Sequence, residues 1–229
     1  MKKLIIVGAL IIFGVSTNLF AQSVGGGFML AIPKNEFKDN VSNLGGGIQA
    51  QITLATPDKY NPFTVGLNVS YMIYGMEHRH VPLSYTVPDV TVEVSRTNSM
   101  ASLHFLFQVS PFEGQVRPYF EGLAGGSYIF TETSVNGDND FDDFASSTNF
   151  DDFAWSLGVG GGFLINLTGE NPDIPGGLFL DFKARYMFGG EAEYLAEGDV
   201  IVNNGRTFVQ TRTSTTDYLA FQIGIVAAF

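Results

Sequence analysis

Residues 63–74 read FTVGLNVSYMIY, and this stretch decides the fold. Phe63, Val65, Leu67 and every second residue after them are apolar or aromatic, while small or polar residues occupy most of the positions between them. Successive side chains of a β-strand point to opposite faces, so the alternation predicts a strand with one apolar face. The strand is long enough for a tilted crossing of a membrane, which takes about 9–11 residues.

The same alternation returns in seven other segments, and the connections between them alternate in length. Compact turns follow the second, fourth and sixth segments, and long polar stretches follow the third, fifth and seventh. Short turns at one end and long loops at the other are typical of an outer-membrane barrel. We therefore predict an all-β fold, an eight-stranded antiparallel up-and-down transmembrane β-barrel. The other predicted strands span residues 24–32, 44–54, 101–109, 118–130, 153–167, 178–188 and 218–229.

The composition supports this fold and excludes several functions. Lys and Arg number 12 against 23 Asp and Glu, a net charge of −11, which disfavours nucleic-acid binding. Only 15% of residues are charged, against about 25% in soluble domains. The main structural alternative, a soluble lipocalin-like barrel, needs a wettable outer face, whereas the second face here is rich in Gly, Ser, Asn and Gln and suits a narrow lumen. The absence of cysteine excludes disulfides and zinc-thiolate sites.

The first residues have the pattern of a secretory signal peptide. Lys2 and Lys3 precede an apolar run from Leu4 to Val15, and the small residue Ala21 follows a polar patch. We expect residues 1–21 to be removed and residues 22–229 to form the barrel in the cell outer membrane.

Three features carry a resemblance to a known family: the ending Phe20-Ala21-Gln22, the segment Arg117-Pro118-Tyr119-Phe120, and the alternation from Leu219 to Phe229. Together they resemble small outer-membrane β-barrel proteins of the OmpA/OmpX-like superfamily, and the first is similar to signal-peptide endings of the Bacteroidetes group. The resemblance implies insertion by the barrel assembly machinery, with the C-terminal aromatic Phe229 as the assembly signal.

Ionisable groups gather on the face predicted to point inward. An eight-stranded barrel is only wide enough for side chains to fill, so we expect these groups to pair with one another. If Ser110 lies opposite Arg117, then His104 and Glu121, on neighbouring strands, are diagonal neighbours. The predicted lumen cluster is His104, Glu121, Asp181, Lys183 and Arg185.

Two alternatives to a structural protein arise from this face. Ser102, His104 and Glu121 resemble the site of outer-membrane lipid A deacylases, in which a base activates a serine. Their order differs from that family's His-x-Ser pattern, and they face the lumen while the lipid lies outside. We therefore expect no enzymatic activity and no cofactor. A narrow solute pore is the other alternative.

The third long loop is acidic. Asp138, Asp140 and Asp142 match the first positions of a calcium-binding EF-hand loop, but Asp143 replaces the required Gly and Asn149 the closing Glu. We expect a solvated loop and regard the three aspartates only as weak metal candidates.

Two external hairpins complete the prediction. Folding at Pro88-Asp89 places Tyr85 opposite Val92 and Leu83 opposite Val94, which creates an exposed apolar face. Folding at Asn204-Gly205, a strong hairpin signal, places Ile201 opposite Phe208. These hairpins either pack on each other and on the acidic loop or bind an extracellular partner. The predicted function is structural or adhesive, carried by the external loops of a monomer surrounded by outer-membrane lipid.

Overall fold

The computed structural model describes most of the chain beyond the predicted signal peptide, which lies outside the described residues. Side chains are described except at residues 79–94, 135–149 and 200–209. No helix in the described part is both long and apolar enough to cross a membrane. The described ranges are residues 23–41, 43–54, 60, 62–84, 87–136, 143–169, 177–195, 199–203 and 206–229.

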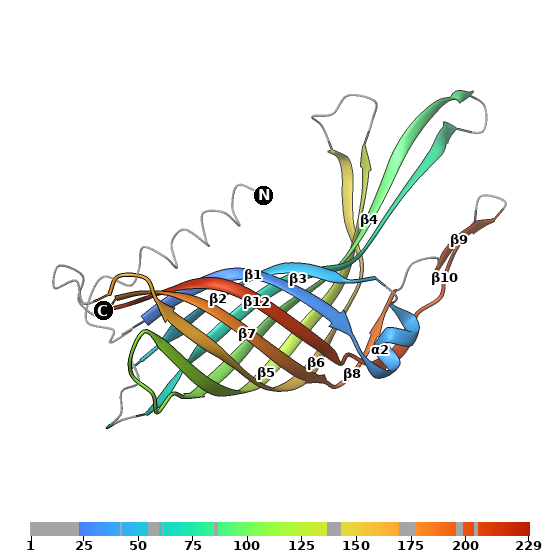
Figure 1. Cartoon of the computed structure of the whole chain (residues 1–229). Coiled ribbons are helices and arrows are strands. Elements are labelled where there is room, and N and C mark those ends of the chain that lie inside the picture. The colour runs from blue at the N-terminus through green and yellow to red at the C-terminus, as the bar shows by residue number, and fades with distance from the viewer. Residues whose placement is uncertain are drawn as a thin grey trace.

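Eight strands close into one antiparallel barrel in the order β1-β12-β7-β6-β5-β4-β3-β2 (Figure 1). The register is continuous from β1 through β12 to β7, and each remaining pair joins strands that are neighbours in the sequence. The predicted eight-stranded up-and-down barrel is confirmed. Its strands are β1 (Ser23–Pro33), β2 (Gly45–Thr53), β3 (Phe63–Ser84), β4 (Val87–Val109), β5 (Val116–Asn136), β6 (Asp143–Asn166), β7 (Gly177–Gly189) and β12 (Tyr218–Ala228).

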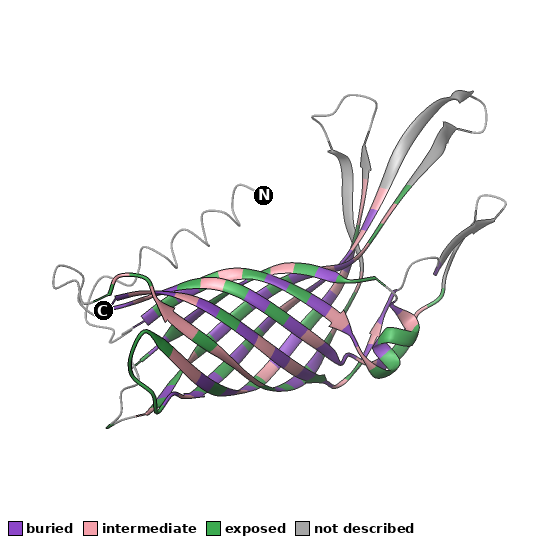
Figure 2. Cartoon of the chain, in the orientation of Figure 1, coloured by how far each residue is buried: buried purple, intermediate pink, exposed green. Residues whose placement is uncertain are grey.

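The outer wall of the barrel is apolar and exposed. Burial alternates residue by residue along the strands (Figure 2), and the exposed positions carry large hydrophobic side chains such as Phe28, Phe105 and Leu157. Aromatic residues mark both ends of this face, as at membrane interfaces. The wall is therefore a lipid-facing surface, and the protein is an outer-membrane β-barrel. The exposed aromatics are Phe63, Phe107, Phe120 and Phe229 towards the short-turn end, and Tyr71, Tyr128, Phe153, Trp155 and Phe188 towards the other.

Four strands continue well beyond the barrel. β3 to β6 are 22, 23, 21 and 24 residues long, whereas β1 has 11 and β2 has 9. Their pairing continues as far as Ser84 opposite Val87 and Asn136 opposite Asp143. We call the described parts of residues 75–98 and 131–152 the external sheet (Figure 1). The first of these segments was predicted as a hairpin, and its strand pairing is confirmed, whereas the prediction of a solvated loop was wrong for the described residues 131–136 and 143–152, which pair as strands.

The predicted register of the first external hairpin was also wrong. Val92 pairs with Val81 instead of Tyr85, and Val94 pairs with Arg79 instead of Leu83. The main cause is that the pairing closes at Ser84 opposite Val87, before the predicted turn at Pro88-Asp89, and a bulge between Pro82 and Ser84 offsets only part of that shift. A bulge adds a residue to one strand only, and the alternation of side chains does not reveal it.

The second external hairpin agrees with the prediction. It consists of β9 (Val200–Asn203) and β10 (Arg206–Val209), with Ile201 opposite Phe208.

A cap that the sequence did not predict covers the external mouth of the barrel. It comprises helix α2 (Asn35–Asn40) and the two-stranded sheet of β8 (Glu191–Tyr194) and β11 (Arg212–Thr215) (Figure 1). Phe37 of α2 is completely buried, and its ring centroid lies 5.4 Å from that of Tyr74 and 5.5 Å from that of Tyr194. We call α2, β8 and β11 the mouth cap.

Candidate functional site

The centre of the lumen is occupied by two ion pairs. Arg185 on β7 binds Glu121 on β5 through two parallel bonds, Nε to Oε1 at 2.5 Å and Nη2 to Oε2 at 3.0 Å. Lys183 Nζ lies 2.9 Å from Asp181 Oδ2 on the same strand. All four side chains are at most 2% exposed. Two cations therefore face two carboxylates, and the buried charge is balanced.

Neutral side chains complete the hydrogen bonding of these charges. Tyr119 donates from its hydroxyl to Asp181 Oδ1 at 2.6 Å. Gln51 Oε1 accepts from Lys183 Nζ at 2.6 Å and lies 3.5 Å from Arg185 Nη2. A buried ion pair needs such bonds because the attraction alone does not offset the loss of hydration. We call Glu121, Asp181, Lys183, Arg185, Tyr119 and Gln51 the lumen ion cluster.

Glycines on β6 make the space for the long side chains of β7. Gly160 pairs with Arg185, and Gly162 pairs with Lys183. A Cβ atom at Gly160 would lie 2.9 Å from Arg185 Cγ, and one at Gly162 would lie 2.7 Å from Lys183 Cβ. The absence of side chains at these glycines of β6 therefore leaves the space that Arg185 and Lys183 of β7 occupy.

His104 is not a diagonal neighbour of Glu121, contrary to the prediction. His104 pairs with Gly125, while Glu121 pairs with Gln108. The register differs by two residues from the predicted one because β5 begins with residues that pair only with β6, such as Val116 with Ile165. This stagger between neighbouring strands is required to close a barrel.

The three residues of the hydrolase alternative bind different partners. Ser102 Oγ lies 2.8 Å from Ser127 Oγ, His104 Nε2 lies 2.6 Å from Ser156 Oγ, and Glu121 binds Arg185. Within the described residues, His104 Nδ1 has no hydrogen-bond partner, so no carboxylate orients the ring. Ser102, His104 and Glu121 therefore do not form the relay of nucleophile, base and carboxylate that the alternative requires.

The lumen above the ion cluster is filled by apolar side chains. Met29, Met72, Met100 and Met187 are buried in one cluster that continues into Phe37 of the mouth cap. Methionine side chains are flexible and fill irregular gaps well. The filled lumen and the mouth cap together leave little room for a solute path.

Polar bonds join the parts of the mouth cap to one another, and Asn35 also ties the cap to the barrel, where its Nδ2 lies 3.1 Å from the hydroxyl of Tyr186 on β7. Asn35 Nδ2 donates to Asp217 Oδ2 at 2.6 Å, and Asn40 Nδ2 donates to Tyr194 OH at 3.1 Å. Arg212 forms an ion pair with Asp199 at 2.8 Å. Burial raises the pKa of Tyr194 above its usual value, so the hydroxyl stays protonated and lies 2.7 Å from Ser214 Oγ.

The remaining predicted site residues lie at the external end or outside the described part. Asp138, Asp140 and Asp142 lie outside the described residues, and those that are described contain no cluster of His, Asp or Glu that could hold a metal ion. Tyr85 is also outside them. Leu83 lies at the bulge between Pro82 and Ser84, and its side chain is not described. For the other predicted surface residues the structure gives the strand pairing but not the side chains: Val92, Val94, Ile201 and Phe208.

These features define the protein as a small outer-membrane β-barrel with a filled lumen. Its fold is similar to that of Neisserial surface protein A, with 14% identity, coverage of 90% of this chain and 96% of that one, and a TM-score of 0.45. A major outer membrane protein from Thermus thermophilus is also similar, with 14% identity, coverage of 90% and 99%, and a TM-score of 0.45. A third is Ail, the attachment invasion locus protein of Yersinia pestis, with 11% identity, coverage of 90% and 97%, and a TM-score of 0.37. No family model and no curated protein matches the sequence.

Proposed function

We propose that this protein attaches the cell surface to an extracellular protein through its external sheet. The observation that carries the proposal is that β3 to β6 continue as paired strands beyond the barrel. The pairing between β4 and β5 extends as far as Glu93 opposite Asn136. A wall that only crosses the membrane needs about 9–11 residues per strand. The additional paired residues therefore serve contacts outside the membrane.

The two borders of the external sheet differ in character. Beyond Ile73, β3 pairs only with β4 among the described residues, and its sequence Glu77-His78-Arg79-His80 is followed by Pro82. Charges and proline protect a strand edge from pairing. From Asp143 to Asp151, the described part of β6 pairs only with β5, and residues 144–150 carry no charge and no proline. We infer that an extended segment of the partner adds to the β6 edge.

The proposal treats the protein as a monomer without enzymatic activity or cofactor, inserted by the barrel assembly machinery and surrounded by outer-membrane lipid. The separate hydrogen bonding of Ser102, His104 and Glu121 supports the absence of a hydrolase site. The ion cluster and the mouth cap support a structural barrel over a solute pore. Phe229, 70% exposed at the short-turn end, is accessible as an assembly signal.

Charges on the external sheet test this proposal. The double variant Val92→Glu/Val94→Glu and the single variant Ser147→Lys should both reach the outer membrane and keep the heat-dependent shift on detergent gels, because all three positions lie beyond the barrel. Attachment of cells to host-protein-coated surfaces should fall at least severalfold for Ser147→Lys, since a charge on the edge opposes strand addition. Val92→Glu/Val94→Glu should reduce it if the apolar residues of β4 also contact the partner.

The matched control is Thr91→Glu, which adds the same charge to β4 at the residue next to Val92. Successive residues of a strand lie on opposite faces. The control variant should attach like the parent at equal surface amount. Parental attachment by both test variants on every coated surface would rule out the adhesive function and leave a purely structural wall protein.

A further inference from the structure

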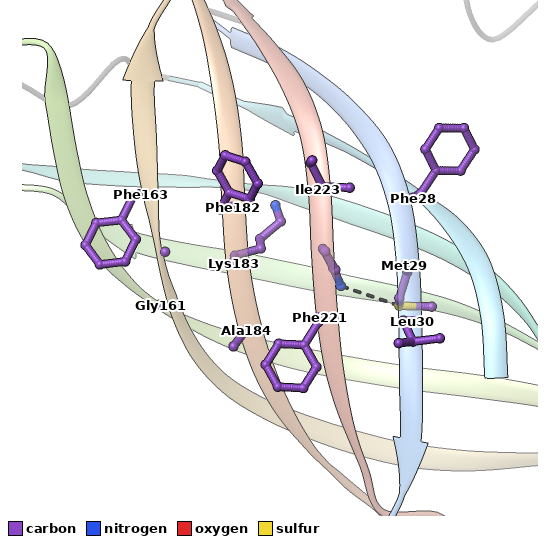
Figure 3. Close-up of a pocket in the computed structure, with 12 residues that line it drawn as sticks. Phe28, Met29, Leu30, Gly161, Phe163, Phe182, Lys183, Ala184, Phe221 and Ile223 are labelled. Carbon is purple, nitrogen blue, oxygen red and sulfur yellow. Dashed lines mark hydrogen bonds between the residues drawn. The ribbon is translucent and has the colours of Figure 1, made fainter. Parts of the chain in front are cut away.

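The lipid-facing wall of the barrel contains an open apolar hollow. It has a volume of about 540 Å³ and lies over β1, β12, β7 and β6 (Figure 3). Gly161 and Ala184, which are paired neighbours, form its floor, and Phe28, Phe163, Phe182 and Phe221 stand around it. This volume lies in the usual range of ligand pockets, about 300–1,000 Å³. We call it the wall groove.

The chemistry of the wall groove is apolar. Its four phenylalanine rings are between 40% and 72% exposed, so they face the membrane and not the lumen. Lys183 contributes to the lining, but its ammonium group is turned into the lumen, where it binds Asp181 and Gln51. No charged group is therefore presented to an occupant, which excludes a headgroup or a polar solute as its ligand.

The position of the wall groove within the bilayer restricts its occupant further. Ala184 lies on β7 between Phe188 at the external aromatic belt and Gly177 at the opposite end. A rise of about 3.3 Å per residue and a tilt of about 40° put the groove roughly 10–15 Å below that belt, near the middle of the bilayer. Only the distal part of a lipid chain reaches this depth.

A second copy of the chain fits the wall groove poorly. A symmetric contact would place the same surface of both copies face to face. The two hollows and their rings of phenylalanine would then oppose each other, with nothing to fill the space between them. A flexible hydrocarbon chain can follow the small floor residues and gain dispersion contacts that a flat wall does not offer.

We propose that the wall groove binds the distal half of one phospholipid acyl chain and retains it longer than the surrounding lipid. This inference is independent of the proposed attachment function, because the groove lies inside the membrane and the external sheet lies outside it. Small residues allow similarly close approach between helices in membranes. Here Gly161 and Ala184 have little or no side chain, so the acyl chain can approach the strand backbone closely.

The test uses tryptophan quenching by phospholipids that carry bromine on the distal half of one acyl chain. The full-length barrel in vesicles receives Phe221→Trp at the groove or Phe105→Trp on the far wall, each combined with Trp155→Phe, because Trp155 is the only native tryptophan. Quenching as a function of the brominated fraction gives a relative association constant. We expect that constant to be roughly threefold higher at the groove, because the groove adds dispersion contacts.

A matched pair of substitutions locates the effect. Ala184→Leu fills the floor and should abolish the difference between the two reporters, while Ala50→Leu makes the same change at an exposed position of β2 outside the groove and should preserve it. Equal constants at both reporters in the parent would overturn the proposal. The proposal would also be overturned, in favour of a dimer, if the tryptophan at the groove were not quenched by the brominated lipid and two copies of the protein could be cross-linked through the groove.

Discussion

Replacing Glu121 with alanine is expected to lower the free energy of unfolding by about 3–5 kcal/mol, because Arg185 would remain buried without the carboxylate that binds it through two bonds. Among the described residues, the other hydrogen-bond partner of its Nη2 atom is Gln51 Oε1, at 3.5 Å. The variant barrel should still insert but unfold at a lower urea concentration. The fluorescence of Trp155 in lipid vesicles measures the transition.

The control for this experiment is Glu132→Ala, which removes a carboxylate from an exposed position of the same strand. A surface substitution of this kind typically changes stability by less than about 0.5 kcal/mol. If the two variants have the same unfolding midpoint, Glu121 is hydrated and the lumen is open to water.

The second large effect is expected for Gly162→Val. The added Cβ atom would overlap the backbone oxygen of Phe182 and lie 2.8 Å from the hydroxyl of Tyr119. The backbone of β7 cannot move away without breaking its pairing with β6, so we expect a loss of at least about 1–3 kcal/mol, the usual range for overpacking. The fraction of heat-modifiable barrel recovered from outer membranes should fall steeply.

Gly122→Val provides the matched control, since a Cβ atom at Gly122 meets nothing within 4 Å. It makes the same substitution in a neighbouring strand and should fold in nearly parental yield. Equal folding of the two variants would show that β6 and β7 do not approach each other as closely as the register of Gly162 and Lys183 requires.

The barrel itself could be predicted because its signal is local. Alternation along each strand separates lipid-facing from lumen-facing residues, as the exposed Val65 and the buried Asn68 illustrate. The composition of the lumen followed from the same alternation, and all five residues of the predicted lumen cluster are buried. Which of them meet depends on the stagger between strands, which the sequence of a single strand does not contain.

The mouth cap, and the uninterrupted continuation of the barrel strands into the external sheet, could not be predicted, for different reasons. Helix α2 has six residues and one buried apolar side chain, Phe37, so no helical periodicity is visible. Its position is fixed by Tyr74 and Tyr194, which are distant in sequence. In the external sheet, polar residues such as Glu77 and Arg96 interact across neighbouring strands at 2.6 Å, so a sequence typical of a loop forms a strand.

Conductance across a planar lipid bilayer tests most directly the central claim, that the barrel is a filled wall whose function lies in the residues outside the membrane. The lumen ion cluster, the buried methionines and the mouth cap occupy the barrel along its length. The parent protein, reconstituted at a density verified by heat-modifiability, is expected to give no stepwise current above the protein-free bilayer. Stable, uniform current steps from the parent would contradict the claim and identify the protein as a narrow solute pore.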